Sequence, residues 1–257
     1  MPQPSISSAQ FVLHLFGTFC LEVRHDLLLH EYHLPRRKVE SLLAYLAVHP
    51  EPHGHSREKL ATLLWGDAPD KQARTSLRTS LAVLRKALGA GVILAEDDSV
   101  QLNPDRSWWI DVREFERLRT TAPELALELC GGELLGDFYD DWILNEREQW
   151  RSRYVDTVLR LAQDLRSRSE YDRASQLARR ALEIDRANET AYQHLMFCEL
   201  ARGNRSGAIF GLSLGGQKDE RDRGCHRIAL QLRQYFKAVP VRHGDIAEDQ
   251  VGQLLVR

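Results

Sequence analysis

The stretch from Lys71 to Leu88 constrains the fold of this chain more than any other segment. It contains neither glycine nor proline, and Leu77, Leu81, Leu84 and Leu88 recur at spacings of four, three and four residues. Because about 3.6 residues make one turn of an α-helix, the four leucines share one face. The pattern predicts a long helix with one buried face and one exposed face.

Segments with other patterns surround this helix in a definite order. Residues 11–34 hold short apolar runs broken by Gly17, which is typical of a small antiparallel strand set. Helical spacing then begins near Pro35, and Ser56 can cap a second helix that ends at Trp65. Residues 91–104 have the pattern of a hairpin with an acidic turn. This order predicts an α+β winged helix-turn-helix domain: strands come first, then two helices, a turn, a third helix and a hairpin.

The second half of the chain has helical periodicity and an internal repeat. The segments EYDRA and NRSGA place Ala174 and Ala208 34 residues apart, which is the tetratricopeptide period. Small alanines allow paired helices to approach closely. We therefore expect the winged helix at residues 11–106, an all-α tetratricopeptide-like domain at 110–210, and an irregular tail at 211–257.

Composition and charge narrow the class of protein. The net charge of −2 hides a division: residues 31–90 carry +4 and residues 91–150 carry −10. Such asymmetry is expected when only one part approaches phosphates. The four cysteines have no CxxC spacing, and neither an export signal nor an apolar run of membrane-spanning length occurs. We expect a cytoplasmic protein that does not enter the membrane.

The exposed face of the 71–88 helix supplies the candidate functional residues. Gln72, Thr75, Thr79 and Lys86 lie opposite the leucines, and Arg78 lies on a flank. Small polar residues allow close approach to a major groove, arginine reads base edges, and lysine neutralises phosphates. The alternative is a merely solvated helix face, but the surrounding order of elements favours groove recognition.

Other candidate groups are weaker. Arg36 and Arg37 begin a helix and can either hold a phosphate backbone or simply be solvated. The aromatic side chains between the two domains are expected to be mostly core, with a partner-binding surface as the alternative. These are Trp108, Trp109, Phe138, Tyr139, Trp142 and Trp150.

Catalytic, metal and cofactor motifs are not found in the sequence. His49, His53 and His55 share a loop without a cysteine or a convincing carboxylate partner, so we expect no metal site. Residues 215–219, GGQKD, do not form a phosphate loop, and no nucleophile and base constellation occurs. We expect no cofactor and no enzymatic activity.

The segments LLW, LRTSLAVLRKAL, WWIDVREFERL and LLGDFYDDWILNERE together resemble one family of regulators. These proteins join an OmpR-type winged helix to a bacterial transcriptional activator domain, the SARP-like class, and the resemblance covers residues 11–209. It implies promoter binding, often at direct repeats by paired copies, and contact with RNA polymerase. It also implies DNA contacts by Arg85 and Lys86. After Ile209 the sequence departs from the family, which we interpret as a divergent or altered tail such as a frameshift produces.

The sequence thus predicts a sequence-specific DNA-binding transcription regulator, an activator, that reads the major groove with the helix 71–88. The helical-repeat domain is expected to serve oligomerisation or contact with RNA polymerase or another partner. The predicted DNA-binding residues are Gln72, Arg74, Thr75, Arg78, Thr79, Arg85 and Lys86, with Arg36 and Arg37 beside them. The alternative is a protein-interaction adaptor of the tetratricopeptide type whose winged helix does not bind DNA.

Overall fold

The computed structural model describes residues 6–26, 28–96 and 98–203. The chain divides between residues 164 and 165 into two compact units, the first α+β and the second helical. The predicted order, an α+β region followed by helices, is confirmed. The predicted domain limits do not coincide with this division and stay a prediction. The predicted tail at 211–257 lies outside the described residues.

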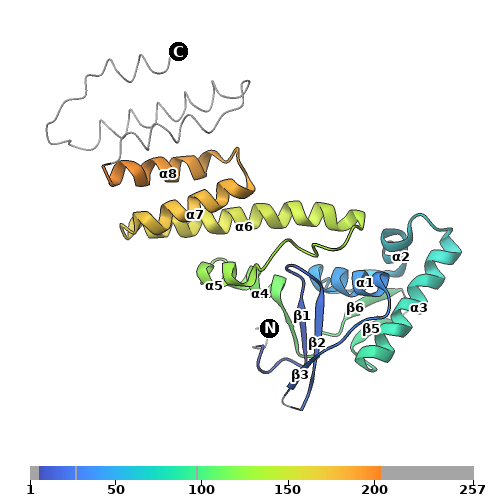
Figure 1. Cartoon of the computed structure of the whole chain (residues 1–257). Coiled ribbons are helices and arrows are strands. Elements are labelled where there is room, and N and C mark those ends of the chain that lie inside the picture. The colour runs from blue at the N-terminus through green and yellow to red at the C-terminus, as the bar shows by residue number, and fades with distance from the viewer. Residues whose placement is uncertain (1–5, 27, 97, 204–257) are drawn as a thin grey trace. The chain divides into compact units, whose positions relative to one another are not determined.

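An N-terminal sheet of four strands has the order β3-β2-β1-β7 (Figure 1). Its strands are β1 (Phe11–His14), β2 (Cys20–His25), β3 (Leu28–Glu31) and β7 (Trp108–Ile110). The first three are antiparallel, as the sequence predicts, whereas β7 pairs with β1 in parallel. Phe11 lies opposite Trp108, and their rings stack at 4.7 Å between centroids. The first strand of the chain is therefore paired with a strand that lies almost a hundred residues later in the sequence.

Three helices follow β3 along the chain and pack against one another: α1 (Arg37–Val48), α2 (Arg57–Trp65) and α3 (Asp70–Leu88). The Ser56 hydroxyl accepts a hydrogen bond from the Lys59 backbone N–H at 3.1 Å, so the predicted cap of α2 is confirmed. Helix α1 begins at Arg37, not at Pro35 as the sequence suggested. Leu42, Leu60 and other apolar side chains of these helices are fully buried and form the core.

A three-stranded sheet follows α3, with the order β4-β6-β5. The predicted hairpin is β5 (Ile93–Glu96) with β6 (Ser99–Leu102), and β4 (His55–Ser56) joins its other edge. Gly54 precedes β4 with φ of +73°, and a Cβ there would lie 3.1 Å from the Val100 carbonyl oxygen. A glycine is needed at this position both for its backbone conformation and for its small size.

Two short helices and an irregular segment lead out of the sheets. The helices are α4 (Asp111–Leu118) and α5 (Pro123–Leu129), and residues 131–140, here called the strap, precede α6 (Asp141–Ser167). The strap is hydrogen-bonded to the turn after β1. Leu135 N–H donates to the Leu15 carbonyl at 2.7 Å, and Gly17 N–H donates to the Glu133 carbonyl at 2.9 Å.

The second unit contains the helix pair α7 (Tyr171–Ile184) and α8 (Glu189–Ala201), which lie side by side in Figure 1. Ala174, Ala178 and Ala181 are fully buried, as expected for small residues that let paired helices approach. The Asn188 side chain accepts from Ala191 N–H and caps α8. Ala208, the second alanine of the repeat, lies outside the described residues.

The aromatic side chains predicted to be core are buried, with one exception. Phe138, Trp142 and Trp150 are nearly inaccessible, as are both tryptophans of β7. Tyr139, in contrast, is 85% exposed. Among the described helices, none combines the length and the apolar character that crossing a membrane requires.

Candidate nucleic-acid interface

Helix α3 is held by its apolar face against the rest of the first unit. Its buried residues are Ala73, Leu77, Ser80, Leu81, Leu84 and Leu88. They pack against α1, α2 and β5. Asp70 lies in the first turn and Arg85 and Lys86 in the last, which suits the helix dipole at both ends. Gly89, with φ of +96°, ends the helix.

The opposite face of α3 is exposed and carries no acidic residue after Asp70. Its exposed residues are Lys71, Gln72, Arg74, Thr75, Arg78, Thr79, Ala82, Arg85 and Lys86. All seven α3 residues that the sequence singled out as DNA-binding are among them. One helix thus presents a continuous basic and small-residue surface, which is the shape and charge that a major groove accepts.

The cationic side chains of this face differ in whether they already have a polar partner. Arg74 faces Glu58 at 3.8 Å with both side chains exposed, a weak pair. Arg85 Nη2 donates to the Ala95 carbonyl at 3.4 Å and so lies toward the hairpin. Within the described residues, the Arg78 guanidinium and the Lys86 ammonium have no polar partner. These two groups, like the Lys71 ammonium at the start of the helix, are therefore available to a ligand.

The Arg37 side chain has partners within the protein that the sequence did not suggest. Its guanidinium pairs with Asp137 at 2.7 Å and with Glu40 at 3.4 Å, and it lies 3.9 Å from the centroid of the Phe138 ring. A phosphate would have to compete with these partners. Arg36, directly before α1, is exposed. Phosphate contacts by Arg36 and Arg37 stay predictions, with Arg36 the better placed.

Asp140 fixes another side chain of α1 to the strap. Its carboxylate lies 2.5 Å from Lys38 Nζ and accepts from the Ser41 hydroxyl at 3.0 Å. Ser41 in turn accepts from the Trp142 indole N–H at 3.3 Å. Asp137 and Asp140 of the strap thus pair with Arg37 and Lys38 at the start of α1, and these two cations are less available to a phosphate than those of α3 that have no partner within the described ranges.

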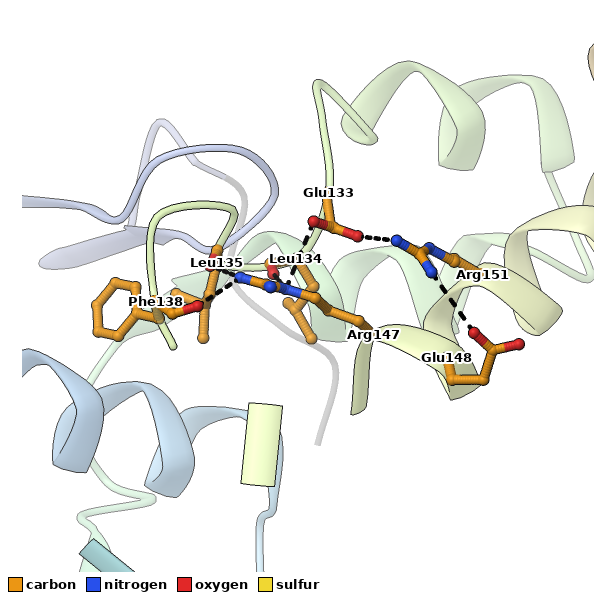
Figure 2. A network of polar contacts seen from close by, with 7 residues as sticks. All are labelled: Glu133, Leu134, Leu135, Phe138, Arg147, Glu148 and Arg151. Carbon is orange, nitrogen blue, oxygen red and sulfur yellow. Dashed lines mark hydrogen bonds and ion pairs between the residues drawn. The ribbon is translucent and has the colours of Figure 1, made fainter. Parts of the chain in front are cut away.

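The Arg147 side chain of α6 donates hydrogen bonds to three backbone carbonyls of the strap (Figure 2). Its Nε donates to the Leu134 carbonyl and its Nη2 donates to the carbonyls of Leu135 and Phe138. The side chain is only 9% exposed, and Glu133 lies 3.6 Å from its Nε. A guanidinium with five N–H donors can satisfy several carbonyls of an irregular segment at once. Nothing in the sequence distinguishes Arg147 from the other charged residues of α6, so its role could not be predicted.

Asp111, which begins α4, is a further buried charged residue, and it binds the backbone after β1. Its carboxylate accepts the backbone N–H groups of Leu15, Phe16 and Val112 at 2.7 to 2.9 Å. Burial raises the pKa of this carboxyl from 3.8 to about 6, against the three hydrogen bonds, which lower it.

This pKa predicts a pH dependence of stability. Because the folded pKa lies above the unfolded one, the folded state holds the proton more tightly, and stability falls as pH rises from about 4 to 7. Relative to Asp111→Asn, which does not titrate, the wild-type free energy of unfolding should fall by about 2 to 3 kcal/mol across that range. Urea unfolding at a series of pH values measures the difference. A difference that rises with pH would show that the three N–H donors outweigh burial.

Two histidines at the loop after α1, His49 and His55, have structural partners. His49 Nε2 lies 3.3 Å from Glu146, and His55 Nε2 lies 2.6 Å from the His49 carbonyl oxygen. Burial lowers the pKa of His49 to about 4. In the described part of the chain, no group of three or more potential ligands could hold a metal ion.

The structure thus has an α+β region with two sheets, followed along the chain by helices. The family described as the bacterial transcriptional activator domain matches residues 110–210. This part of the chain is therefore similar to the bacterial transcriptional activator domain. The segments WWIDVREFERL and LLGDFYDDWILNERE, which resemble this family, lie within the matched residues.

Comparison with solved structures supports the fold of the remaining residues. The structure is similar to that of Mycobacterium tuberculosis EmbR in complex with a low-affinity phosphopeptide, with a TM-score of 0.72 and 16% identity. The match covers 91% of this chain and 66% of the EmbR chain. The search of curated protein sequences gave no significant match.

Proposed function

We propose that the chain is a sequence-specific DNA-binding transcription regulator, an activator, that reads the major groove with α3. The exposed, acid-free face of α3 carries this proposal, because it joins unoccupied cations to small side chains on a firmly packed helix. The protein acts without a cofactor or enzymatic step, in the bacterial cytoplasm. Its DNA contacts include Thr75, Arg78 and Thr79 for bases and Lys86 for phosphate.

In this proposal, the rest of the chain binds protein partners. The helical-repeat domain contacts RNA polymerase or a second copy of the chain, and paired copies bind direct repeats in a promoter. The matched domain, bacterial transcriptional activator, supports this role. The hairpin tip takes little part in binding, because Glu96 and Asp98 are exposed there and phosphates repel them.

A salt titration tests whether α3 meets phosphates. Affinity for a labelled random-sequence duplex should fall steeply between 50 and 200 mM salt, as roughly expected when several counterions are released. Lys86→Ala should weaken binding to all sequences equally and reduce the salt slope by about 1. Arg160→Ala removes the same charge from the exposed side of α6 and is the matched control.

The outcomes distinguish a DNA-binding regulator from a protein-interaction adaptor. A reduced slope for Lys86→Ala, with wild-type behaviour of Arg160→Ala, supports the proposal. Equal effects of the two variants would show that binding depends on net charge alone. If the wild-type protein does not bind duplex at all, the adaptor function replaces the regulator.

A further inference from the structure

The two threonines of the exposed α3 face use their hydroxyl protons inside the helix. Thr75 Oγ1 donates to the Lys71 carbonyl at 2.8 Å, and Thr79 Oγ1 donates to the Thr75 carbonyl at 3.0 Å. A hydroxyl has one proton, so neither group can also donate to a base without giving up this bond. The hydroxyls are therefore poor readers of the acceptors that purines and thymine present.

The γ-methyl groups of the same residues are what remains to face a ligand. With the oxygen turned to the preceding turn, the methyl takes another staggered position on Cβ. Both side chains are exposed, and they lie about 6 Å apart along the helix axis. That separation is close to two base-pair steps, about 7 Å. Ala82 adds a further exposed methyl on the next turn.

Only one base presents an apolar group in the major groove. Thymine carries its C5-methyl there, and threonine methyl groups pack on it. Arg78, beside both threonines on α3, has a guanidinium without a polar partner among the described residues, and guanine offers the O6 and N7 acceptors that fit such a fork. The surface is thus complementary to thymine methyls next to a guanine.

We propose that Thr75 and Thr79 read thymine through its 5-methyl group, at positions that flank a guanine bound by Arg78. The proposal rests on the proposed DNA-binding function and names the bases that function recognises. In it, the intrahelical hydroxyl bonds fix the rotamers that point the methyls outward. The rival is readout by hydroxyl oxygens that accept from the amino groups of adenine or cytosine.

Deoxyuridine separates the two modes, because it keeps every hydrogen-bonding group of thymine and lacks only the methyl. The probe is the duplex that the full chain enriches from a randomised library, with each thymine replaced in turn. At the positions read by Thr75 and Thr79, we expect binding about fourfold weaker per methyl removed. Replacements elsewhere in the duplex should leave the affinity unchanged.

Two substitutions assign the effect to one residue. Thr79→Val keeps the γ-methyl and removes the hydroxyl, whereas Thr79→Ser does the opposite. Thr79→Val should retain both affinity and the preference for thymine over deoxyuridine. Thr79→Ser should bind the thymine duplex as weakly as wild type binds the deoxyuridine duplex and should no longer distinguish them. Thermal unfolding of both variants confirms that each is folded.

The failure of this proposal is distinguishable from failure of the proposed function. An enriched site that is insensitive to deoxyuridine at every position, or a Thr79→Val variant that loses binding while Thr79→Ser retains it, overturns methyl readout alone. A library from which nothing is enriched overturns the regulator function, and the methyl readout with it.

Discussion

Replacing Arg147 with methionine should lower the free energy of unfolding of the first unit by about 3 kcal/mol. The change removes the donors of the Leu134, Leu135 and Phe138 carbonyls, and each buried acceptor left without a partner costs about 1 to 3 kcal/mol. Loss of the desolvation penalty of the guanidinium offsets part of this cost. Methionine keeps the apolar stem, so the effect reports on the hydrogen bonds and not on packing.

Urea unfolding of the full chain measures this effect, and proteolysis locates it. We expect faster cleavage within the strap, because its carbonyls lose their common donor. Arg151→Met is the matched control: Arg151 is one turn further along α6 and pairs with Glu133 and Glu148 at the surface (Figure 2). Exposed pairs contribute about 1 kcal/mol or less. Equal losses for the two variants would contradict the assigned role of Arg147.

Replacing Arg78 with alanine should cost roughly 1 to 3 kcal/mol of binding free energy for the preferred duplex. The expected loss falls on one base pair, because a guanidinium that contacts a guanine edge reads that position and no other. Among the described residues no polar partner must be displaced before Arg78 binds, so little of the contact energy is spent on rearrangement. Specificity at that base pair should relax, while other positions keep theirs.

Competition with a panel of single-base-pair variants measures the specificity. Arg74→Ala is a suitable comparison, since Arg74 lies on the same helix but faces Glu58. It should weaken binding less and alter no base preference. If Arg78→Ala instead weakens all duplexes by the same factor, Arg78 contacts phosphate and the readout assigned to it is wrong.

The helix that carries the candidate site could be predicted because its information is local. The leucine spacing fixed the buried face of α3, and with it the opposite face, before any tertiary contact was known. The Ser56 cap could be predicted for the same reason, since the hydroxyl and its donor are three residues apart. DNA contact by these residues stays a prediction.

Features that depend on distant residues could not be predicted. Strands β4 and β7 are two and three residues long, and each exists only because a partner strand lies beside it. Their sequences, HS and WWI, contain no alternation from which a strand can be inferred. Short strands of this kind are set by tertiary pairing and not by intrinsic preference.

The partners of two charged residues could not be predicted for a related reason. Arg37 and Arg147 both look like solvated charges in sequence, and the acids and carbonyls that hold them come from the strap. For Arg37 the partner Asp137 is a hundred residues away. Periodicity assigns a face of a helix, but it does not show what another segment places against that face.

Selection from a randomised duplex library at about physiological salt tests whether the protein recognises a DNA sequence through α3. The full chain and its Arg78→Ala variant are each incubated with the library, and the retained duplexes are sequenced. We expect an enriched motif for the wild type, with thymines flanking a guanine and with direct repeats at helical-turn spacing, and loss of the guanine preference in the variant. Retained pools without any motif would contradict this expectation and would leave the helical-repeat domain as the functional surface.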